Sequence, residues 1–520
     1  MSKEKKAPPK LMTKVERVVT KRPVPLPAQN SSKTSKPIAK AVNGSARKET
    51  ALRNSHTPAS SRPSSKEPVE RIRQERSRPN KRSSPTISTP HFTSDDDDEE
   101  EVKPRKRART EEVYDPRRRI RDLDAFNEDE AGEMQRVHAY DIANENLQLN
   151  SHSQYTAFFE TLAADEDEEN EPICLEYPGA TTEPEKYQLV KPKDQTDFKP
   201  IQEILDTMKV ISEHYLDEAS AKEVFCDEDG SGFYQKLNRQ IHFALKSRPG
   251  SQKAFIGIIH DYNRFMRAKR SDGTIAKTID GMPKIPLQLV EHIIKNQIYA
   301  RTVSPQVGLV RQYESFSDNV YGELLPKFLS RIFKETNLRS GQIFVDLGSG
   351  VGNCVLQAAL ETGCEAWGCE MMANPAKLAT LQAKEFPARC KLWGLKPGPI
   401  KLIQDDFLEN VEIREVLKKA DVILINNQAF TAELNDKLKY RFLDLKEGAQ
   451  IISLKYYRDP LMKIKESNLN DPVNVLTVQE KERFSEMVSW TSDPGKWYIH
   501  VKDTTELKAF SKRLDANGSA

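Results

Sequence analysis

The stretch Ile343–Gly352 reads IFVDLGSGVG, and it decides the fold that we expect for this chain of 520 residues. A short apolar run contains an acid, Asp346, and glycines at 348, 350 and 352 precede the helix-forming run NCVLQAALE. This pattern predicts a buried strand that turns sharply into a helix, because glycine permits open backbone angles and lets a ligand approach without a Cβ in the way. Open α/β sheets bind ligands in such a crevice, at the carboxyl ends of their strands.

The spacing of the glycines separates two kinds of nucleotide ligand. The dinucleotide fingerprint G-x-G-x-x-G requires a third glycine at position 353, where this chain has Asn353. The spacing G-x-G-x-G shortly after Asp346 is instead typical of S-adenosylmethionine binding. A tight turn between strand and helix, with no ligand, is the alternative that the loop alone leaves open.

The rest of the chain predicts how this unit is built. Before the loop, apolar residues recur at helical spacing in 201–215, 255–266 and 287–299, which indicates a helical segment packed against the unit that contains the loop. After it, strands are expected at 365–370, 401–406, 421–427 and 449–455, and helices at 375–386 and 432–443. The motifs SWT and WYIHV, from Val488 on, fit edge or antiparallel strands. This alternation predicts a Rossmann-like α/β fold with a mostly parallel sheet.

The first 94 residues have a different composition, with 22 Lys and Arg against 6 Asp and Glu. They are rich in Pro and Ser, so we expect a disordered arm that neutralises DNA phosphates, with a solvated linker as the alternative. An acidic run, Asp95–Glu101, follows, and the basic clusters at Lys103–Arg109 and from Arg117 are typical of nuclear import signals. No apolar run approaches the length of a membrane span, so we expect no membrane contact.

Polar residues follow the predicted strands at the positions where each one ends. Glu370 lies 24 residues after Asp346, close to the separation at which an acid meets a ribose hydroxyl in doubly wound folds. Asp406 and Phe407 offer a carboxylate for an adenine amino group and an aromatic face for its ring. Asn426 and Asn427 end the fourth strand. Any one of these residues could be a helix N-cap, but caps do not explain four such ends in register.

Five motifs together carry a family resemblance: NVYGE (319–323), DLGSGVGN (346–353), DDF (405–407), INNxAF (425–430) and VSWT (488–491). In this order they resemble the disruptor of telomeric silencing 1 family, histone lysine methyltransferases that lack a SET domain. The resemblance spans about 313–500. It implies methyl transfer from S-adenosylmethionine to a lysine on the globular core of histone H3 in nucleosomes, in the nucleus, with a role in chromatin silencing.

The resemblance also implies roles for individual residues. The implied cofactor contacts are Val320, Tyr321, Gly322 and Glu323 in a covering loop, Asp346, Gly348, Ser349, Gly350 and Asn353 around the methionine end, Glu370 at the ribose, and Asp406 with Phe407 at the adenine. Phe316, Asn426, Trp490 and Tyr498 are implied to line or border the lysine channel. Gln428 departs from the family's usual aromatic after Asn-Asn, which bears on how apolar one wall of that channel is.

The chemistry needs positioning more than covalent catalysis, because the methyl group is already activated by the sulfonium. We expect no metal. The incoming lysine must be neutral, and a desolvated channel lowers its pKa by disfavouring the ammonium. We therefore assign Asn426 and Tyr498 to orientation by hydrogen bonding. A chromatin-bound scaffold that has lost catalysis and a methyltransferase for RNA or small molecules are the alternatives.

The domain organisation that we expect combines composition, periodicity and the resemblance. It consists of a disordered basic arm at 1–120, a polar and acidic linker at 121–197, a helical subdomain at 198–312, a methyltransferase catalytic domain at 313–510 and a C-terminal tail at 511–520.

Overall fold

The computed structural model describes residues 115–126, 136–148, 154–159, 172–180, 184–226, 228, 230–246, 248, 251–310 and 322–518, with the backbone alone for 144–148 and 517–518. They all belong to one compact unit, Pro104–Ala520. The predictions for the acidic run and for the basic arm up to residue 114 lie outside this described part. Within it, no helix has both the length and the apolar character needed to cross a membrane.

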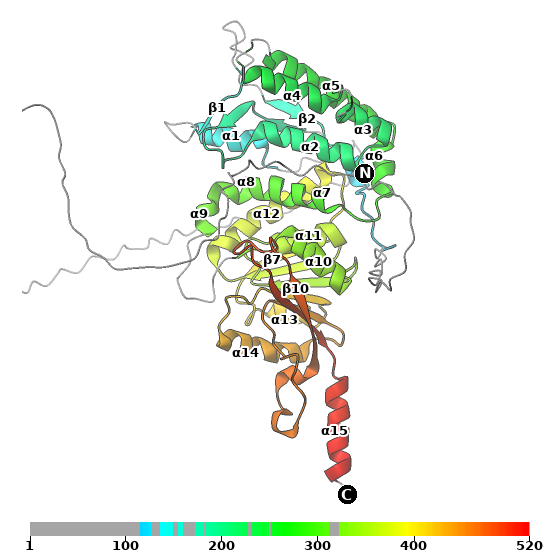
Figure 1. The fold of residues 1–520 in the computed structure, drawn as a ribbon, viewed down its shortest axis with the longest axis vertical. Helices are drawn as coiled ribbons and strands as arrows, with labels where there is room; N and C mark the ends of the chain where they lie inside the picture. The colour runs from blue at the N-terminus through cyan, green and yellow to red at the C-terminus, as the bar shows by residue number, and fades with distance from the viewer. Residues whose placement is uncertain are drawn as a thin grey trace, which may run out of the picture. The chain divides into compact units, whose positions relative to one another are not determined.

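A seven-stranded sheet organises the C-terminal part of the chain (Figure 1). Its strands are β5 (Ile343–Leu347), β6 (Glu365–Glu370), β7 (Ile400–Gln404), β8 (Val422–Ile425), β9 (Gln450–Ser453), β10 (Leu476–Arg483) and β11 (Gly495–Lys502). Their spatial order is β10-β11-β9-β8-β5-β6-β7, and β11 runs antiparallel to both of its neighbours while the other pairs are parallel. The order reverses between β5 and β8, where open α/β sheets bind ligands. The predicted Rossmann-like fold is confirmed.

The two faces of this sheet bury alternate residues of each strand. On β8, Val422 and Leu424 join one apolar core while Ile423 and Ile425 join the other. Because both faces are covered, the strands read as continuous apolar runs. The first face is covered by α10 (Pro326–Thr336), α11 (Asn353–Thr362) and α12 (Ala373–Leu392), and the second by α13 (Val411–Leu417) and α14 (Ala432–Arg441).

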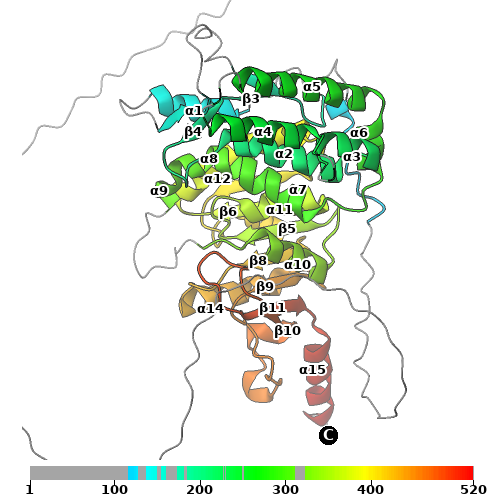
Figure 2. The ribbon, with the colours of Figure 1, turned by 45° about the horizontal axis from the view of Figure 1, so that its top comes forward.

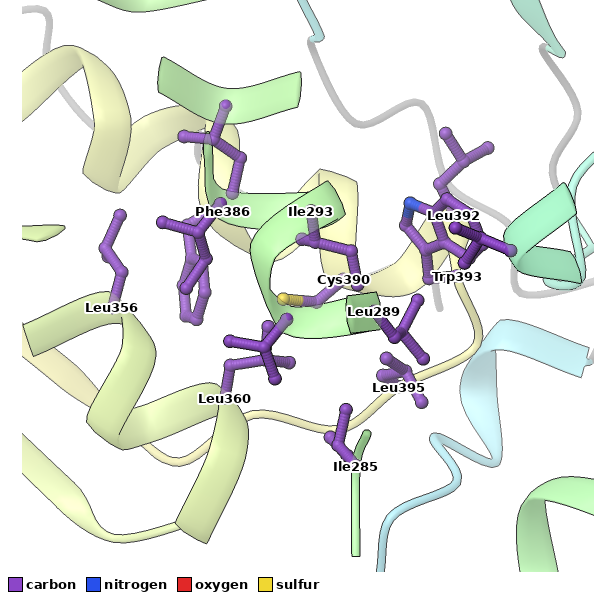
Figure 3. Packing of buried hydrophobic residues seen from close by; sticks show 14 of the residues in the cluster. Ile285, Leu289, Ile293, Leu356, Leu360, Phe386, Cys390, Leu392, Trp393 and Leu395 are labelled. Atoms are coloured by element: carbon purple, nitrogen blue, oxygen red, sulfur yellow. The ribbon is translucent and has the colours of Figure 1, made fainter. Parts of the chain in front are cut away.

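Helices before the sheet form a second layer on α11 and α12. They are α1 (Ala139–Gln148), α2 (Pro200–His214), α3 (Glu218–Val224), α4 (Phe233–Ala244), α5 (Ser251–Ser271), α6 (Thr274–Asp280), α7 (Leu287–Glu291) with a π-helical continuation (His292–Tyr299), α8 (Ala300–Thr302) and α9 (Val307–Val310). Figure 3 shows Leu289 and Ile293 packed among Leu360 of α11 and Phe386 and Cys390 of α12. The expected helical segment therefore shares one apolar core with the sheet.

The segment expected to be a linker, 121–197, contributes buried residues to this core, among them Leu175, Tyr177 and Tyr187. Two short antiparallel pairs lie here, β1 (Tyr155–Ala157) with β4 (Val190–Pro192) and β2 (Ile173–Leu175) with β3 (Glu185–Tyr187). Residues 115–120, assigned to the arm, are also packed, since Ile120 is buried and Arg118 donates to the carbonyls of Leu360 and Lys396. Both boundaries therefore differ from the prediction.

A buried ion network gives Glu185, an acid of this segment, a structural role. Glu185 is fully buried and accepts hydrogen bonds from Arg301 at 2.9 Å and Arg389 at 3.0 Å. Those arginines also bind Glu203 and Glu385, each at 2.6 Å. Burial alone would raise the pKa of Glu185, but the guanidiniums of Arg389 and Arg301 hold it well below its usual value. Because these arginines lie more than a hundred residues downstream of Glu185, the sequence around it does not indicate that the acid is buried. The polar segment was therefore predicted to be a linker.

Other elements differ in detail from the expectation. The helix predicted at 375–386 continues through Pro387 to Leu392, and SWT lies in the connection between β10 and β11, outside both strands. Strand β10 was not predicted, because its alternating charged residues mark an edge strand only once β11 is beside it. The expected tail at 511–520 continues α15 (Thr505–Gly518) in its described part.

Candidate functional site

The glycine loop between β5 and α11 takes the shape that its sequence requires. Gly348, Gly350 and Gly352 all have positive φ, at 85°, 54° and 89°. The backbone N–H groups of Gly348 and Ser349 donate to the carbonyl of Cys369 at 2.9 and 3.0 Å, which ties the loop to the end of β6. A Cβ at Gly348 would lie 3.7 Å from Cζ of Phe430, so the glycine keeps the space beside that ring open.

Glu370 ends β6 and is held across the loop by backbone groups. Its Oε2 accepts from the Gly350 N–H at 2.9 Å and its Oε1 from the Met372 N–H at 2.8 Å. Burial raises the pKa of Glu370, while these backbone hydrogen bonds oppose that shift. Each carboxylate oxygen keeps acceptor capacity. The side chain is therefore oriented in advance to accept hydrogen bonds from a pair of hydroxyl groups.

These elements surround a cavity of about 480 Å³, a size suited to a nucleoside-type ligand. Eleven of the residues singled out from the sequence line it: Gly322, Glu323, Asp346, Gly348, Ser349, Gly350, Asn353, Glu370, Asp406, Phe407 and Asn426. They come from the ends of β5, β6, β7 and β8 and from the segment before α10. The parallel strands thus bring together residues that are more than a hundred positions apart in the chain.

Asp346 lies at the inner end of the cavity and is only 3% exposed. Burial raises the pKa of Asp346 to about 7, the hydrogen bond with the Cys354 thiol opposes this shift, and the nearby charge of Glu370 adds to it. The thiol itself is held neutral, because burial raises its pKa well above the usual value. A cationic group placed beside Asp346, such as the ammonium of a methionine moiety, would favour the carboxylate.

Two aromatic rings line another part of the cavity. Phe407 and Phe430 lie nearly parallel, with ring centroids 6.4 Å apart and planes inclined by 26°. Asp406, the preceding residue, accepts from the Leu408 N–H at 2.8 Å, which fixes its carboxylate at the rim. This combination suits an adenine ring, which has an apolar face and an amino group at its edge.

Asn426 lines the cavity beside the segment that contains Gly322. Its Nδ2 donates to the carbonyl of Gly322 at 3.0 Å, while its buried Oδ1 has no hydrogen-bond partner among the described residues. The indole of Trp490 covers Gly322 so closely that a Cβ there would lie 2.6 Å from Cε3. Residues 323–325 are paired with 487–489 by backbone hydrogen bonds, so the motif VSWT positions the chain directly after Gly322.

Three of the predicted site residues lie outside the described residues, namely Phe316, Val320 and Tyr321. Tyr498 is buried on β11 level with the end of β9, but it does not line the cavity, and its hydroxyl donates to Oε2 of Glu480 at 3.3 Å. Trp490 also lies outside the cavity lining and is 39% exposed. Gln428 is exposed and does not line this cavity.

Several lining residues were missed in the sequence. Phe430 and Cys354 stand inside or beside quoted motifs, so their place near Asn426 and Asn353 could have suggested them. Asn427 has a supporting role that the sequence did not reveal, because its amide joins β8 to the carbonyl and N–H of Lys455 after β9. Gln382 similarly donates to the Val351 carbonyl at 2.6 Å and to Asn353 at 2.9 Å, which fastens the glycine loop to α12.

A parallel sheet with one reversed strand, a glycine loop between two acids and an aromatic slot define an S-adenosylmethionine-dependent methyltransferase. A family model described as "Histone methylation protein DOT1" matches residues 299–502. The "Histone-lysine N-methyltransferase, H3 lysine-79 specific" of Aspergillus fumigatus is 44% identical over 485 residues, which cover 89% of this chain and 93% of that protein. The chain belongs to this family, as the sequence motifs predicted.

Two further matches complete the comparison. The protein of the same description from Emericella nidulans is 46% identical over 411 residues, which cover 79% of this chain and 78% of that protein. Among solved structures, an RNA methyltransferase from Salinibacter ruber in complex with S-adenosyl-L-homocysteine is 18% identical, with a TM-score of 0.23, and covers 35% of this chain and 94% of that chain.

Proposed function

We propose that this chain transfers methyl groups from S-adenosylmethionine to a lysine of histone H3, at the position that the names of its relatives give as H3 lysine-79. The observation that carries the proposal is one cavity that joins the preset carboxylate of Glu370 to the unpartnered Oδ1 of Asn426. A cofactor held at Glu370, Phe407 and Asp346 would have its sulfonium end on the side of Asn426. Because Asn426 also lines the cavity, its free oxygen is available to a ligand there.

The chain's own residues bind the cofactor, limit access of water and orient the lysine. When bound, the cofactor supplies a methyl group activated for in-line displacement. Gly348 and Gly350 let it approach the backbone, Glu370 orients it, and the segment at Gly322 with Trp490 limits access of water from one side. The Asn426 Oδ1 is a hydrogen-bond acceptor for an amine N–H, so it would orient the neutral amine of the lysine. A dry environment favours that neutral form, because desolvation disfavours the ammonium.

The biological setting belongs to the same proposal. We assign the reaction to nucleosomes in the nucleus, with a role in chromatin silencing, and we assign the basic arm to contact with nucleosomal DNA. The catalytic domain would span 313–510 and rest on the helical subdomain that precedes it. The uneven charge supports the arm's assignment, since 22 Lys and Arg precede residue 95.

The test is methylation of reconstituted nucleosomes by the full chain with labelled cofactor, followed by mass spectrometry of H3. We expect label on one H3 lysine, and none on nucleosomes whose H3 has arginine there. Asn426→Ala should lower turnover by at least tenfold, which is more than its effect on cofactor affinity. The control variant is Asn470→Ala, because Asn470 is exposed and lies outside the cavity lining.

Two results would favour the other hypotheses. Cofactor binding without transfer to any histone would indicate the scaffold, and transfer to RNA in place of H3 would indicate an RNA methyltransferase.

The arm is tested separately by deleting residues 1–114. We expect weaker nucleosome binding with a shallower salt dependence and an unchanged cofactor affinity. If an arm with the same residues in scrambled order fails like the deletion, the arm is a specific docking motif and the electrostatic proposal is wrong.

A further inference from the structure

The helices α4 and α5 form a hairpin with a strongly basic surface. Residues 233–271 contain nine Lys and Arg residues and a single acid, Asp261, in a chain whose net charge is only +2. The two helices pack against each other and lie side by side in Figures 1 and 2. Positive charge is therefore concentrated on one structural unit of the described fold, in addition to the basic arm.

The buried face of α5 is apolar, and its cations lie on the other side. Phe255, Tyr262 and Met266 are fully buried toward the core. Lys253 and Arg264 are exposed and stand 11 residues apart, which places them on one stripe of a helix with 3.6 residues per turn. Arg239 on α4 and Lys246 in the turn after it are also exposed, and they stand seven residues apart. We call Arg239, Lys246, Lys253 and Arg264 the hairpin cations.

The hairpin cations are not engaged in strong ion pairs. Arg239, Lys246 and Lys253 pair with no acid in the part of the chain that the structure describes. Arg264 lies 3.3 Å from Asp261, but the two side chains are 77% and 58% exposed, and such a pair is weak. On α14, by contrast, Lys437 and Lys439 pair with acids one turn away.

Two other arginines of α5, Arg267 and Arg270, have a structural role. Arg267 and Arg270 bind Glu176 at 2.8 and 3.1 Å and so tie α5 to the segment after β2. No comparable bond fixes Arg239, Lys246 or Lys253 within the described structure. Their accumulation without acids costs repulsion, which a polyanion bound to this hairpin would relieve.

We propose that the hairpin cations bind the sugar-phosphate backbone of double-stranded DNA. From Lys253 to Arg264 the helix extends about 17 Å, a length over which a DNA duplex carries about ten phosphate charges. The exposed positions between them on α5 are Ala254, Gly257, His260 and Asp261, and none of these is a large apolar anchor for a protein partner. The choice of DNA over RNA rests on the proposed function in chromatin.

The proposal is tested on the full chain, without cofactor, by fluorescence anisotropy with a duplex DNA of about 30 base pairs. The hairpin variant combines Arg239→Gln, Lys246→Gln, Lys253→Gln and Arg264→Gln. The control variant removes the same charge from exposed positions elsewhere, through Lys419→Gln, Lys508→Gln, Lys512→Gln and Arg513→Gln. We expect the hairpin variant to bind at least tenfold more weakly and its salt slope to fall by about 3 to 4, with a smaller change in the control.

The proposal would be overturned if the hairpin variant and the control variant lost equal affinity for DNA. It would also be overturned if the hairpin variant lost more affinity for an RNA hairpin or for polyglutamate than for DNA. Because the arm also binds in this assay, position is checked by replacing His260 with a photoreactive benzoylphenylalanine in the otherwise unaltered chain. We expect cross-links to DNA from position 260 and few from position 512. Absence of cross-links from position 260 would refute the proposal even if the hairpin variant failed to fold. Cofactor affinity and nucleosome methylation are measured in the same variants. Failure of the DNA-binding proposal can therefore be distinguished from failure of the proposed methyltransferase function.

Discussion

Replacing Asp346 with Asn should make the protein more stable at high pH while it weakens cofactor binding. Asp346 is 3% exposed, and burial raises its pKa to about 7 from an ordinary value of 3.8. The folded state therefore holds the proton more tightly than the unfolded state does. For an acid shifted in this direction, the contribution to stability falls as the pH rises from about 4 to about 7 and stays low above that.

The size of the effect follows from the shift. At 1.36 kcal/mol per pKa unit, the ionisable Asp346 destabilises the fold by about 4 kcal/mol at pH 8 and by about 2 kcal/mol at pH 5. The asparagine variant would carry no charge at either pH, although its buried amide costs about 1–3 kcal/mol if a donor stays unpaired. That cost does not change with pH. Relative to the unaltered protein, the free energy of unfolding of Asp346→Asn should thus be about 2–3 kcal/mol more favourable at pH 8 than at pH 5.

The assay is urea unfolding of both proteins at the two pH values, without cofactor. The exposed Asp444 supplies the control variant, Asp444→Asn, for the loss of a carboxylate. Calorimetry with the cofactor should show an affinity reduced by at least tenfold for Asp346→Asn, because the cationic methionine end loses its counter-charge. An equal loss of stability at both pH values would show that Asp346 is ionised in the empty fold and would refute the reasoning.

Three further predictions concern other parts of the structure. Gly348→Arg should abolish cofactor binding in calorimetry, whereas Gly448→Arg, with a similar positive φ but open space around it, should keep it; equal losses would assign the effect to backbone strain. The family resemblance assigns the Tyr498 hydroxyl to the lysine channel, although Tyr498 does not line the cofactor cavity. Tyr498→Phe should therefore lower turnover several-fold with cofactor affinity unchanged, and unaltered turnover would exclude that role. Glu185→Gln should lower the free energy of unfolding by about 3–5 kcal/mol, because two buried arginines lose a shared partner. The exposed Glu223→Gln should be almost neutral in the same urea titration, and a similar small loss at Glu185 would contradict the buried network.

Much of the fold was predictable because local patterns and global architecture agree along 343–455. The apolar runs of β5 and β8 are sealed on both faces, and the glycines between β5 and α11 need positive φ. Strand β10 and the packed parts of 121–197 were not predictable in this way. Their stability comes from β11 and from Arg301 and Arg389, which are distant in the sequence.

In the candidate site, too, some residues could be predicted from the sequence and others could not. Asp346, Glu370, Asp406 and Asn426 could be selected from the sequence because each lies at the end of an apolar run, and parallel strands place such ends on one edge. No sequence pattern pairs Phe430 with Phe407, or marks Asn427 as a brace and Asn426 as the residue with an open oxygen. Those differences depend on where each side chain points.

Sequence information was therefore sufficient for the kind of site: a glycine loop between acids at strand ends, in an order of motifs that identifies the family. These features depend on backbone conformation at single residues and on the order of motifs, and both can be read directly along the chain. The burial of each polar group depends instead on partners far along the chain, so it became evident only from the folded arrangement. That arrangement raises the pKa of Asp346, places two arginines beside Glu185, and leaves the hairpin cations exposed without strong ion pairs.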